Sequence, residues 1–236
     1  MFFRNENILE KVSKGSETDK REFFKGTGYK SKRRGSFFTK WYNFYFSPIR
    51  FEKINFLEIG VGRGNSLFMW KKFFVNANIY GIEIDKTYLE YSKNKLENIE
   101  IFIGDQSNEK FLKKVCKKVE DGFDIIIDDG SHITGHQVIT FEYLFKKLNP
   151  GGVYVIEDIH TSYLKGFKKG SCKNIINYLK NRVEDVNIRG KIRKYYNAYD
   201  ILNQKKHKLS YYEKSIESIH FYPDICFIFK RGIENE

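Results

Sequence analysis

Acidic side chains and a histidine follow two short apolar runs in this sequence. Asp128 and Asp129 end the first run and precede Gly130-Ser131-His132, while Glu157 and Asp158 end the second. If both runs are strands of a parallel sheet, their carboxyl ends border the crevice in which such sheets bind ligands. Crowded carboxylates are unstable unless positive charge compensates them, so a divalent cation is the simplest candidate ligand. Oxygen ligands favour Mg²⁺, with Mn²⁺ or Ca²⁺ as alternatives, and disfavour zinc.

A glycine-rich segment follows an earlier apolar run, with the sequence Glu58-Ile59-Gly60-Val61-Gly62-Arg63-Gly64-Asn65-Ser66. Glycines permit a tight turn and a close approach of ligand to backbone, and the helix that follows presents N–H groups at its start. We expect Asn65 or Ser66 to cap that helix. A dinucleotide fingerprint would have glycine at position 65, whereas this spacing is the E-x-G-x-G-x-G form of methyltransferases. We therefore predict cofactor contacts from Glu58, Gly60, Gly62, Gly64 and Ser66.

Two further strand ends carry polar groups suited to a nucleoside. The next apolar run ends in Gly81-Ile82-Glu83-Ile84-Asp85, which places a carboxylate where a ribose diol would lie. We choose Glu83 for that contact because it lies at the strand tip, while Asp85 is the alternative or a helix cap. The third run ends in Gly104-Asp105-Gln106, where Asp105 or Gln106 would contact adenine.

Alternating apolar runs and helical patterns position these groups. We predict parallel strands at residues 54–59, 79–84, 99–103, 123–128 and 153–157, with continuous apolar character typical of strands covered on both faces. The clearest helix has Val138, Phe141, Phe145 and Leu148 at helical spacing and ends at Asn149-Pro150-Gly151-Gly152. Such alternation predicts an α/β, Rossmann-like doubly wound sheet.

The last part of the chain predicts an antiparallel hairpin. Strand-like runs at 218–222 and 225–230 are joined only by Pro223-Asp224, too short a link for a parallel crossover. This completes a seven-stranded sheet of the kind found in S-adenosylmethionine (SAM) dependent methyltransferases. We predict an N-terminal cap or arm over 1–50 and one catalytic domain over 51–236, in which 161–215 forms a lid or an oligomer contact.

The bulk composition gives weaker guidance. The net charge of +12 favours anionic partners or reflects solvated lysine-rich helix faces. The three cysteines are widely spaced, and no apolar run approaches the roughly 18 residues of a membrane span. We expect a cytoplasmic protein without a membrane span, and a homo-oligomer is one open arrangement.

The sequence resembles the metal-dependent sugar O-methyltransferases of macrolide biosynthesis, the mycinamicin and macrocin group. The resemblance covers most of residues 16–164 and the final hairpin. It rests on Leu57-Glu58-Ile59-Gly60, Gly104 to Ser107, Phe123 to His132, Pro150 to Tyr163, Thr18-Asp19-Lys20, Phe38-Thr39 with Tyr42, and Ile219 to Tyr222. Phe38 stands where that group usually has tyrosine.

The resemblance implies roles for particular residues. Asp129, Glu157 and Asp158 fall on the metal ligands of the group, and His132 falls on its general base. Asp128 would then either support the metal ligands from behind or lie on the cofactor side. We expect His136 to be a surface residue of the next helix, and His160 to touch acceptor or cofactor as one open alternative.

The predicted function is therefore SAM-dependent and Mg²⁺-dependent methylation of a sugar hydroxyl. The acceptor would be a nucleotide-sugar, a surface-polysaccharide sugar or a glycosylated natural product, and a phosphorylated sugar would suit the basic charge. The alternatives are an RNA methyltransferase and a non-catalytic SAM-binding protein. We do not expect nucleic acid as the partner, because methylation of RNA does not call for the acid cluster and we find no separate RNA-binding module in the sequence.

Overall fold

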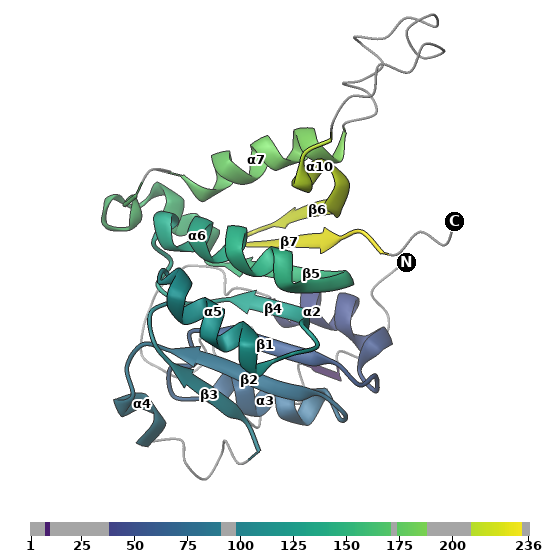
Figure 1. Cartoon of the computed structure of the whole chain (residues 1–236), viewed down its shortest axis with the longest axis vertical. Helices are drawn as coiled ribbons and strands as arrows, with labels where there is room; N and C mark the ends of the chain where they lie inside the picture. Colours follow the sequence, from purple (N-terminus) through teal and green to yellow (C-terminus); the bar gives the residue numbers. More distant parts are fainter. Residues whose placement is uncertain (1–7, 10–37, 91–97, 171–173, 188–208, 233–236) are drawn as a thin grey trace, which may run out of the picture.

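The computed structural model describes residues 8–9, 38–90, 98–170, 174–187 and 209–232, without the side chains of 89–90. Its centre is a seven-stranded sheet in the order β3-β2-β1-β4-β5-β7-β6 (Figure 1). The strands are β1 Asn55–Ile59, β2 Asn78–Glu83, β3 Glu100–Ile103, β4 Phe123–Asp128, β5 Leu148–Glu157, β6 Ile216–Tyr222 and β7 Ile225–Lys230. The predicted α/β sheet is confirmed, and each predicted strand corresponds to one of these.

The directions of the strands place the predicted site residues at one edge of the sheet. Strands β1 to β5 pair in parallel, so their carboxyl ends share that edge. Strand β7 runs antiparallel to both β5 and β6, as the hairpin prediction required. The hairpin turn at Pro223-Asp224 therefore returns to the carboxyl end of β5, where the Asp224 carbonyl accepts a hydrogen bond from Ile159 N at 3.1 Å.

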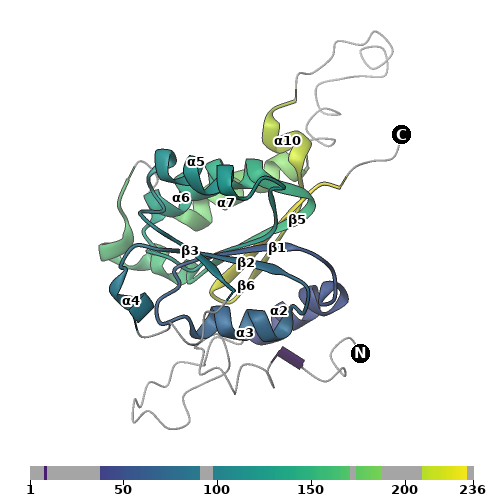
Figure 2. The same ribbon diagram turned by 60° about the horizontal axis from the view of Figure 1, so that its bottom comes forward.

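Helices cover both faces of the sheet (Figure 2). They are α2 Phe38–Phe46, α3 Asn65–Phe73, α4 Thr87–Glu90, α5 Glu109–Lys118, α6 Thr134–Leu144, α7 Ile175–Val186 and α10 Tyr211–Ser215. Helices α5, α6 and α7 pack on one face and α2 and α3 on the other. Successive strand residues serve opposite faces: Val153 and Val155 of β5 pack with α2 and α3, whereas Tyr154 and Ile156 pack with α5 to α7.

Helix α2 belongs to the core rather than lying loosely on it. Its buried side chains Tyr42 and Phe46 pack against Trp70 of α3 and Phe227 of β7. Aromatic side chains bury large apolar areas, and edge-on ring contacts of this kind add to the stability that the burial gives. The predicted division into a cap over 1–50 and a domain over 51–236 stays a prediction, because residues 1–7 and 10–37 lie outside the described part of the chain.

Two local predictions are wrong. Helix α6 ends at Leu144, one short 3₁₀ turn follows at Phe145–Lys147, and Leu148 is the first residue of β5, where it pairs with Phe123. The segment Asn149-Pro150-Gly151-Gly152 thus lies inside β5 rather than ending a helix. The side chain of Asn149 helps to hold it there by donating to Asp124 Oδ1 at 2.9 Å.

The predicted side-chain cap of α3 is also wrong. The N-cap is Gly64 in the left-handed conformation (φ 74°), and Asn65 and Ser66 are the first helical residues. The Ser66 hydroxyl donates instead to the buried carboxylate of Glu58, at 2.7 Å. A buried carboxylate requires such a donor, which accounts for the different use of the serine.

Part of the predicted lid or oligomer contact, 161–215, is described. It includes the end of the 3₁₀ turn Ile159–Tyr163, the 3₁₀ turn Lys165–Phe167, helix α7 and helix α10. Residues 171–173 and 188–208 lie outside the described part of the chain. The role of this segment stays a prediction. Thr18-Asp19-Lys20 also lies outside. Within the described ranges, every helix is too short or too polar to cross a lipid bilayer.

Substitution of the loop glycines tests how tightly the glycine-rich turn packs. Gly60 (φ +88°) and Gly62 (φ +50°) are both left-handed, but a Cβ on Gly60 would overlap the carbonyl oxygen of Asp129, while a Cβ on Gly62 would meet nothing within 4 Å. We expect Gly62→Ala to cost about 1 kcal/mol through backbone conformation alone. Gly60→Ala should cost roughly 3 kcal/mol or more, because the end of β4 must move. Thermal unfolding of the two variants measures the difference, and equal melting temperatures would contradict the close contact.

Candidate functional site

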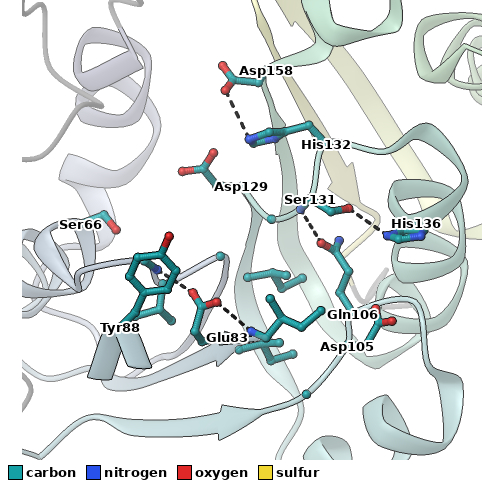
Figure 3. Close-up of a pocket in the computed structure, with 18 of the residues that line it drawn as sticks. Ser66, Glu83, Tyr88, Asp105, Gln106, Asp129, Ser131, His132, His136 and Asp158 are labelled. Carbon is teal, nitrogen blue, oxygen red and sulfur yellow. Dashed lines mark hydrogen bonds and ion pairs between the residues drawn. The ribbon is translucent and has the colours of Figure 1, made fainter. Parts of the chain in front are cut away.

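A cavity of about 660 Å³ opens at the carboxyl ends of β1 to β4. Figure 3 shows polar side chains from several strand ends pointing into it. The predicted site residues on its wall are Gly60, Gly62, Ser66, Glu83, Asp105, Gln106, Asp129, His132 and Asp158. The sheet therefore brings most of the predicted cofactor and metal groups together in one place. Four predicted residues are not on the wall. Glu58, Asp128 and Glu157 are buried, and Gly64 is the N-cap of α3.

The glycine loop is tied to the end of β2 through Glu83. Its Oε2 accepts a hydrogen bond from Gly62 N at 2.7 Å, and its Oε1 accepts from Ile84 N and Asp85 N at 2.8 and 3.0 Å. These donors hold the carboxylate in a fixed orientation on the cavity wall. Asp85 instead accepts from the Thr87 hydroxyl and backbone N–H, which lowers the pKa of its carboxyl, and it lies outside the cavity at the start of α4.

A buried hydrogen-bond network beside the cavity links the residues that follow β3 to the end of β4. Gln106 donates from Nε2 to Asp128 Oδ1 at 3.0 Å, and its Oε1 accepts from Ser131 N at 2.7 Å. Asp128 is fully buried, and burial raises the pKa of its carboxyl to about 6, while the donors Gln106, Gly130 N and Tyr154 oppose the rise. Gln106 thus holds the Asp128 carboxylate and the loop after β4 in one arrangement.

Asp105 and His136 form the neighbouring part of the wall. The Asp105 carboxyl is partly buried, which raises its pKa, but hydrogen bonds from Ser107 and the proximity of His136 leave the pKa below its usual value. His136 lies in the first turn of α6, half-buried, with Nδ1 3.0 Å from the Ser131 hydroxyl. The prediction of a surface position for His136 is therefore wrong, because the loop after β4 folds against the helix start.

Acids and histidine gather where β4 and β5 end. Atoms of Asp129, His132 and Asp158 that could coordinate a metal ion lie within 4.8 Å of one another. The same holds for carboxylate oxygens of Glu58, Asp129 and Glu157. The His132 Nε2 atom is 3.6 Å from Asp158 Oδ2, a contact drawn in Figure 3. Asp129 belongs to both groups, so the predicted metal residues converge on one point of the sheet edge. Carboxylate oxygens in this number fit a hard divalent cation.

Strained backbone conformations occur at this same point. His132 and Asp158 have φ of 55° and 53°, in the left-handed region that residues other than glycine rarely adopt. Such conformations persist only where surrounding contacts enforce them, and they are common in functional sites. Both aim their side chains toward the space above Asp129 (Figure 3).

Several contacts at the site were not predicted from the sequence. Tyr42 of α2 donates its hydroxyl to Glu157 Oε1 at 2.6 Å. His160 Nδ1 lies 3.8 Å from Asp158 and 3.5 Å from Asp224 of the hairpin turn, so His160 faces acids rather than the cavity wall. Tyr88 of α4 lines the cavity. The contacts of Tyr42 and Asp224 join distant parts of the chain, and only the folded topology shows them.

This chain is similar to known methyltransferases. A family model described as a methyltransferase domain matches residues 51–213. The chain is 31% identical over 205 residues to an 8-demethyl-8-alpha-L-rhamnosyl tetracenomycin-C 2'-O-methyltransferase of Streptomyces olivaceus, covering 83% of this chain and 50% of that protein. It is 32% identical to a mycinamicin VI 2''-O-methyltransferase of Micromonospora griseorubida, covering 82% of this chain and 48% of that protein. The chain thus spans about half the length of these relatives.

Solved structures agree with this result. MycE, a methyltransferase of the mycinamycin biosynthetic pathway solved in complex with Mg and SAH, matches with a TM-score of 0.76 and 30% identity. The match covers 99% of this chain and 56% of the MycE chain. A second MycE structure, which also contains mycinamycin VI, gives a TM-score of 0.74 at 30% identity.

Proposed function

The chain belongs to the methyltransferase domain family, and we propose that it transfers the methyl group of SAM to a sugar hydroxyl of a glycosylated small molecule with the help of a divalent cation. One observation carries this proposal. The glycine-rich cavity and the cluster of Asp129, His132 and Asp158 form a single continuous site, so a cofactor and a cation-bound acceptor would meet there.

The cofactor side is the part of the cavity formed by β1, β2 and β3. The backbone of Gly60, Gly62 and Gly64 and the start of α3 at Ser66 would hold the methionine portion of SAM. Glu83 would accept hydrogen bonds from the ribose hydroxyls, and Asp105 and Gln106 would face adenine. Glu58 and Asp128 are fully buried behind this wall, so they would act by holding Ser66 and Gln106 in place.

The cation side fits Mg²⁺, with Mn²⁺ as a replacement. Asp129, Glu157 and Asp158 would supply carboxylate oxygens, the ligands that both ions prefer. When bound, the cation would orient neighbouring hydroxyls of the acceptor and make the reacting hydroxyl more acidic. Structures of MycE in complex with Mg support this assignment.

His132 would be the general base. An imidazole titrates near neutral pH and can take the proton of the acceptor hydroxyl at Nε2. Asp158 Oδ2, 3.6 Å from that nitrogen, would stabilise the imidazolium that forms. Because the sulfonium methyl group of SAM is already reactive, alignment of hydroxyl oxygen, methyl carbon and sulfur in the cavity would supply much of the acceleration.

The acceptor class follows from the relatives. The names of the tetracenomycin and mycinamicin enzymes describe O-methylation of a sugar on a natural product. Of the three acceptor classes that the sequence left open, the relatives favour a glycosylated natural product over a nucleotide-sugar or a surface-polysaccharide sugar. The cytoplasmic location and the homo-oligomer remain predictions.

The first experiment measures SAM binding by calorimetry and methyl transfer to a panel of glycosides and nucleotide-sugars, with Mg²⁺ and with EDTA. We expect micromolar SAM binding and transfer to at least one sugar hydroxyl, with the transfer lost in EDTA and restored by Mg²⁺. SAM binding without transfer to any sugar would favour the non-catalytic protein, and transfer to RNA alone would favour the RNA methyltransferase. Absence of SAM binding would remove the proposed function.

Glu83 and Asp85 form a matched pair for testing the cofactor side. Glu83→Ala removes the predicted ribose contact and the acceptor of Gly62 N, so the Kd for SAM should rise at least about tenfold. Asp85→Asn lies two residues away and outside the cavity, so it should leave the Kd unchanged. Calorimetric titration of each purified variant measures both constants. An Asp85 effect equal to that of Glu83 would contradict the assignment.

Removal of the base tests the chemical step. His132→Ala should lower the rate of methyl transfer about 10²- to 10⁴-fold, the usual contribution of general-base catalysis. SAM affinity should remain within about twofold, because His132 lies on the acceptor side of the cavity. Transfer is measured with labelled SAM at saturating acceptor. A variant that retains the full rate would exclude His132 as the base.

A further inference from the structure

The hydroxyl of Tyr42 is the one polar atom of a side chain otherwise enclosed by aromatic rings. The ring centroid of Tyr42 lies 5.0 Å from that of Trp70, 5.4 Å from Phe46 and 5.6 Å from Phe227, and the residue is fully buried. A buried tyrosine hydroxyl needs a hydrogen-bond partner. Here it donates to Glu157 Oε1 at 2.6 Å, across 115 positions of sequence.

Glu157 is the most enclosed of the predicted metal ligands. Only 2% of its surface is exposed. One of its carboxylate oxygens lies within 4.8 Å of carboxylate oxygens of Glu58 and Asp129. Three carboxylates at this spacing repel one another, so the orientation of each depends on the donors that surround it. A short hydrogen bond from a neutral hydroxyl to a carboxylate is strong and directional, and it stabilises the ionised form that binds a cation.

The position of Tyr42 is fixed by contacts that do not involve Glu157. On the same helix, the Tyr45 hydroxyl lies 2.6 Å from both His220 Nδ1 and the Tyr222 hydroxyl of β6. Trp41 stacks on Tyr222 with ring centroids 3.6 Å apart. Helix α2 is thus attached to the terminal hairpin, and its Tyr42 hydroxyl is presented to the end of β5 at a defined point.

We propose that Tyr42 is a positioning residue of the metal centre: its hydroxyl orients the Glu157 carboxylate for the divalent cation and so makes helix α2 part of the site. The inference rests on the proposed function, because that function supplies the cation. Tyr42 is fully buried and does not line the cavity proposed for SAM and the acceptor. Its hydroxyl would act on the site through the Glu157 carboxylate, so metal affinity is the property that reports on it.

Two conservative substitutions on α2 separate positioning from packing. Tyr42→Phe keeps the ring among Phe46, Trp70 and Phe227 and removes only the hydroxyl. Tyr45→Phe removes a hydroxyl one turn away that contacts His220 and Tyr222 but not Glu157. The Tyr45 ring contacts with Phe227 and Phe229 and the stacking of Trp41 on Tyr222 remain and keep α2 attached to the hairpin, so this variant is the matched control. Thermal unfolding of both variants checks that each remains folded.

Mn²⁺ binding, followed by electron paramagnetic resonance of the free ion with SAM-saturated protein, is the readout. We expect Tyr42→Phe to weaken Mn²⁺ about 10- to 100-fold, the usual effect of removing a residue that holds a ligand. Tyr45→Phe should leave the Kd for Mn²⁺ within about twofold of the wild type. SAM affinity, measured by calorimetry, should be unchanged in both.

Each outcome has a definite meaning. Mn²⁺ binding by Tyr42→Phe within twofold of the wild type would overturn the inference and leave the proposed function intact. Equal losses in the two variants would also overturn it, because they would reflect a loosened helix. A wild-type protein that binds SAM but no Mn²⁺ would remove the metal dependence itself, and the inference with it.

Discussion

Burial of negative charge at the carboxyl edge of the parallel sheet is the constraint on which this structure depends. Glu58, Asp128 and Glu157 are almost completely enclosed, and Asp129 and Asp158 lie next to them. Ionised carboxylates in such a place are costly unless hydrogen-bond donors or cations compensate them. The fold supplies side-chain donors to each enclosed acid, among them Ser66 to Glu58, Gln106 to Asp128 and Tyr42 to Glu157. The raised pKa of Asp128, about 6, shows that compensation by neutral donors is incomplete.

These donors come from elements with different roles in the fold. Ser66 begins the helix after β1, Gln106 follows β3, and Tyr42 lies on a helix that precedes the sheet in the chain. The terminal hairpin then fixes that helix through Tyr45 and brings Asp224 beside His160. The antiparallel hairpin therefore does more than complete the sheet. It also contacts Ile159 and His160, the two residues that follow the acids at the end of β5.

The sequence predicted the sheet and nine residues of the cavity wall, because both follow from local signals. One example is the run from Phe123 to Asp128. Its continuous apolar residues indicate a strand buried on both faces, and the acid at its end marks where the strand stops. Local signals failed where a distant residue decided the outcome. Ser66 serves Glu58 instead of capping a helix, and Leu148 pairs with Phe123 instead of extending α6. The family resemblance included Tyr42 but not its contact with Glu157, which lies 115 positions away and meets it only in the folded chain.

The arrangement also explains how one cavity can serve two ligands of different charge. Its cofactor side is lined by backbone N–H groups and by acids already engaged with donors, as Glu83 is with Gly62, Ile84 and Asp85. On its other side, potential ligand atoms of Asp129, His132 and Asp158 lie within 4.8 Å of one another. A divalent cation would be stabilised by these clustered carboxylates, because carboxylate oxygens are the ligands that such ions prefer. The proposed acceptor would therefore meet the cofactor at the boundary between the two, which is the line from Gly60 to Asp129 where β1 and β4 end side by side.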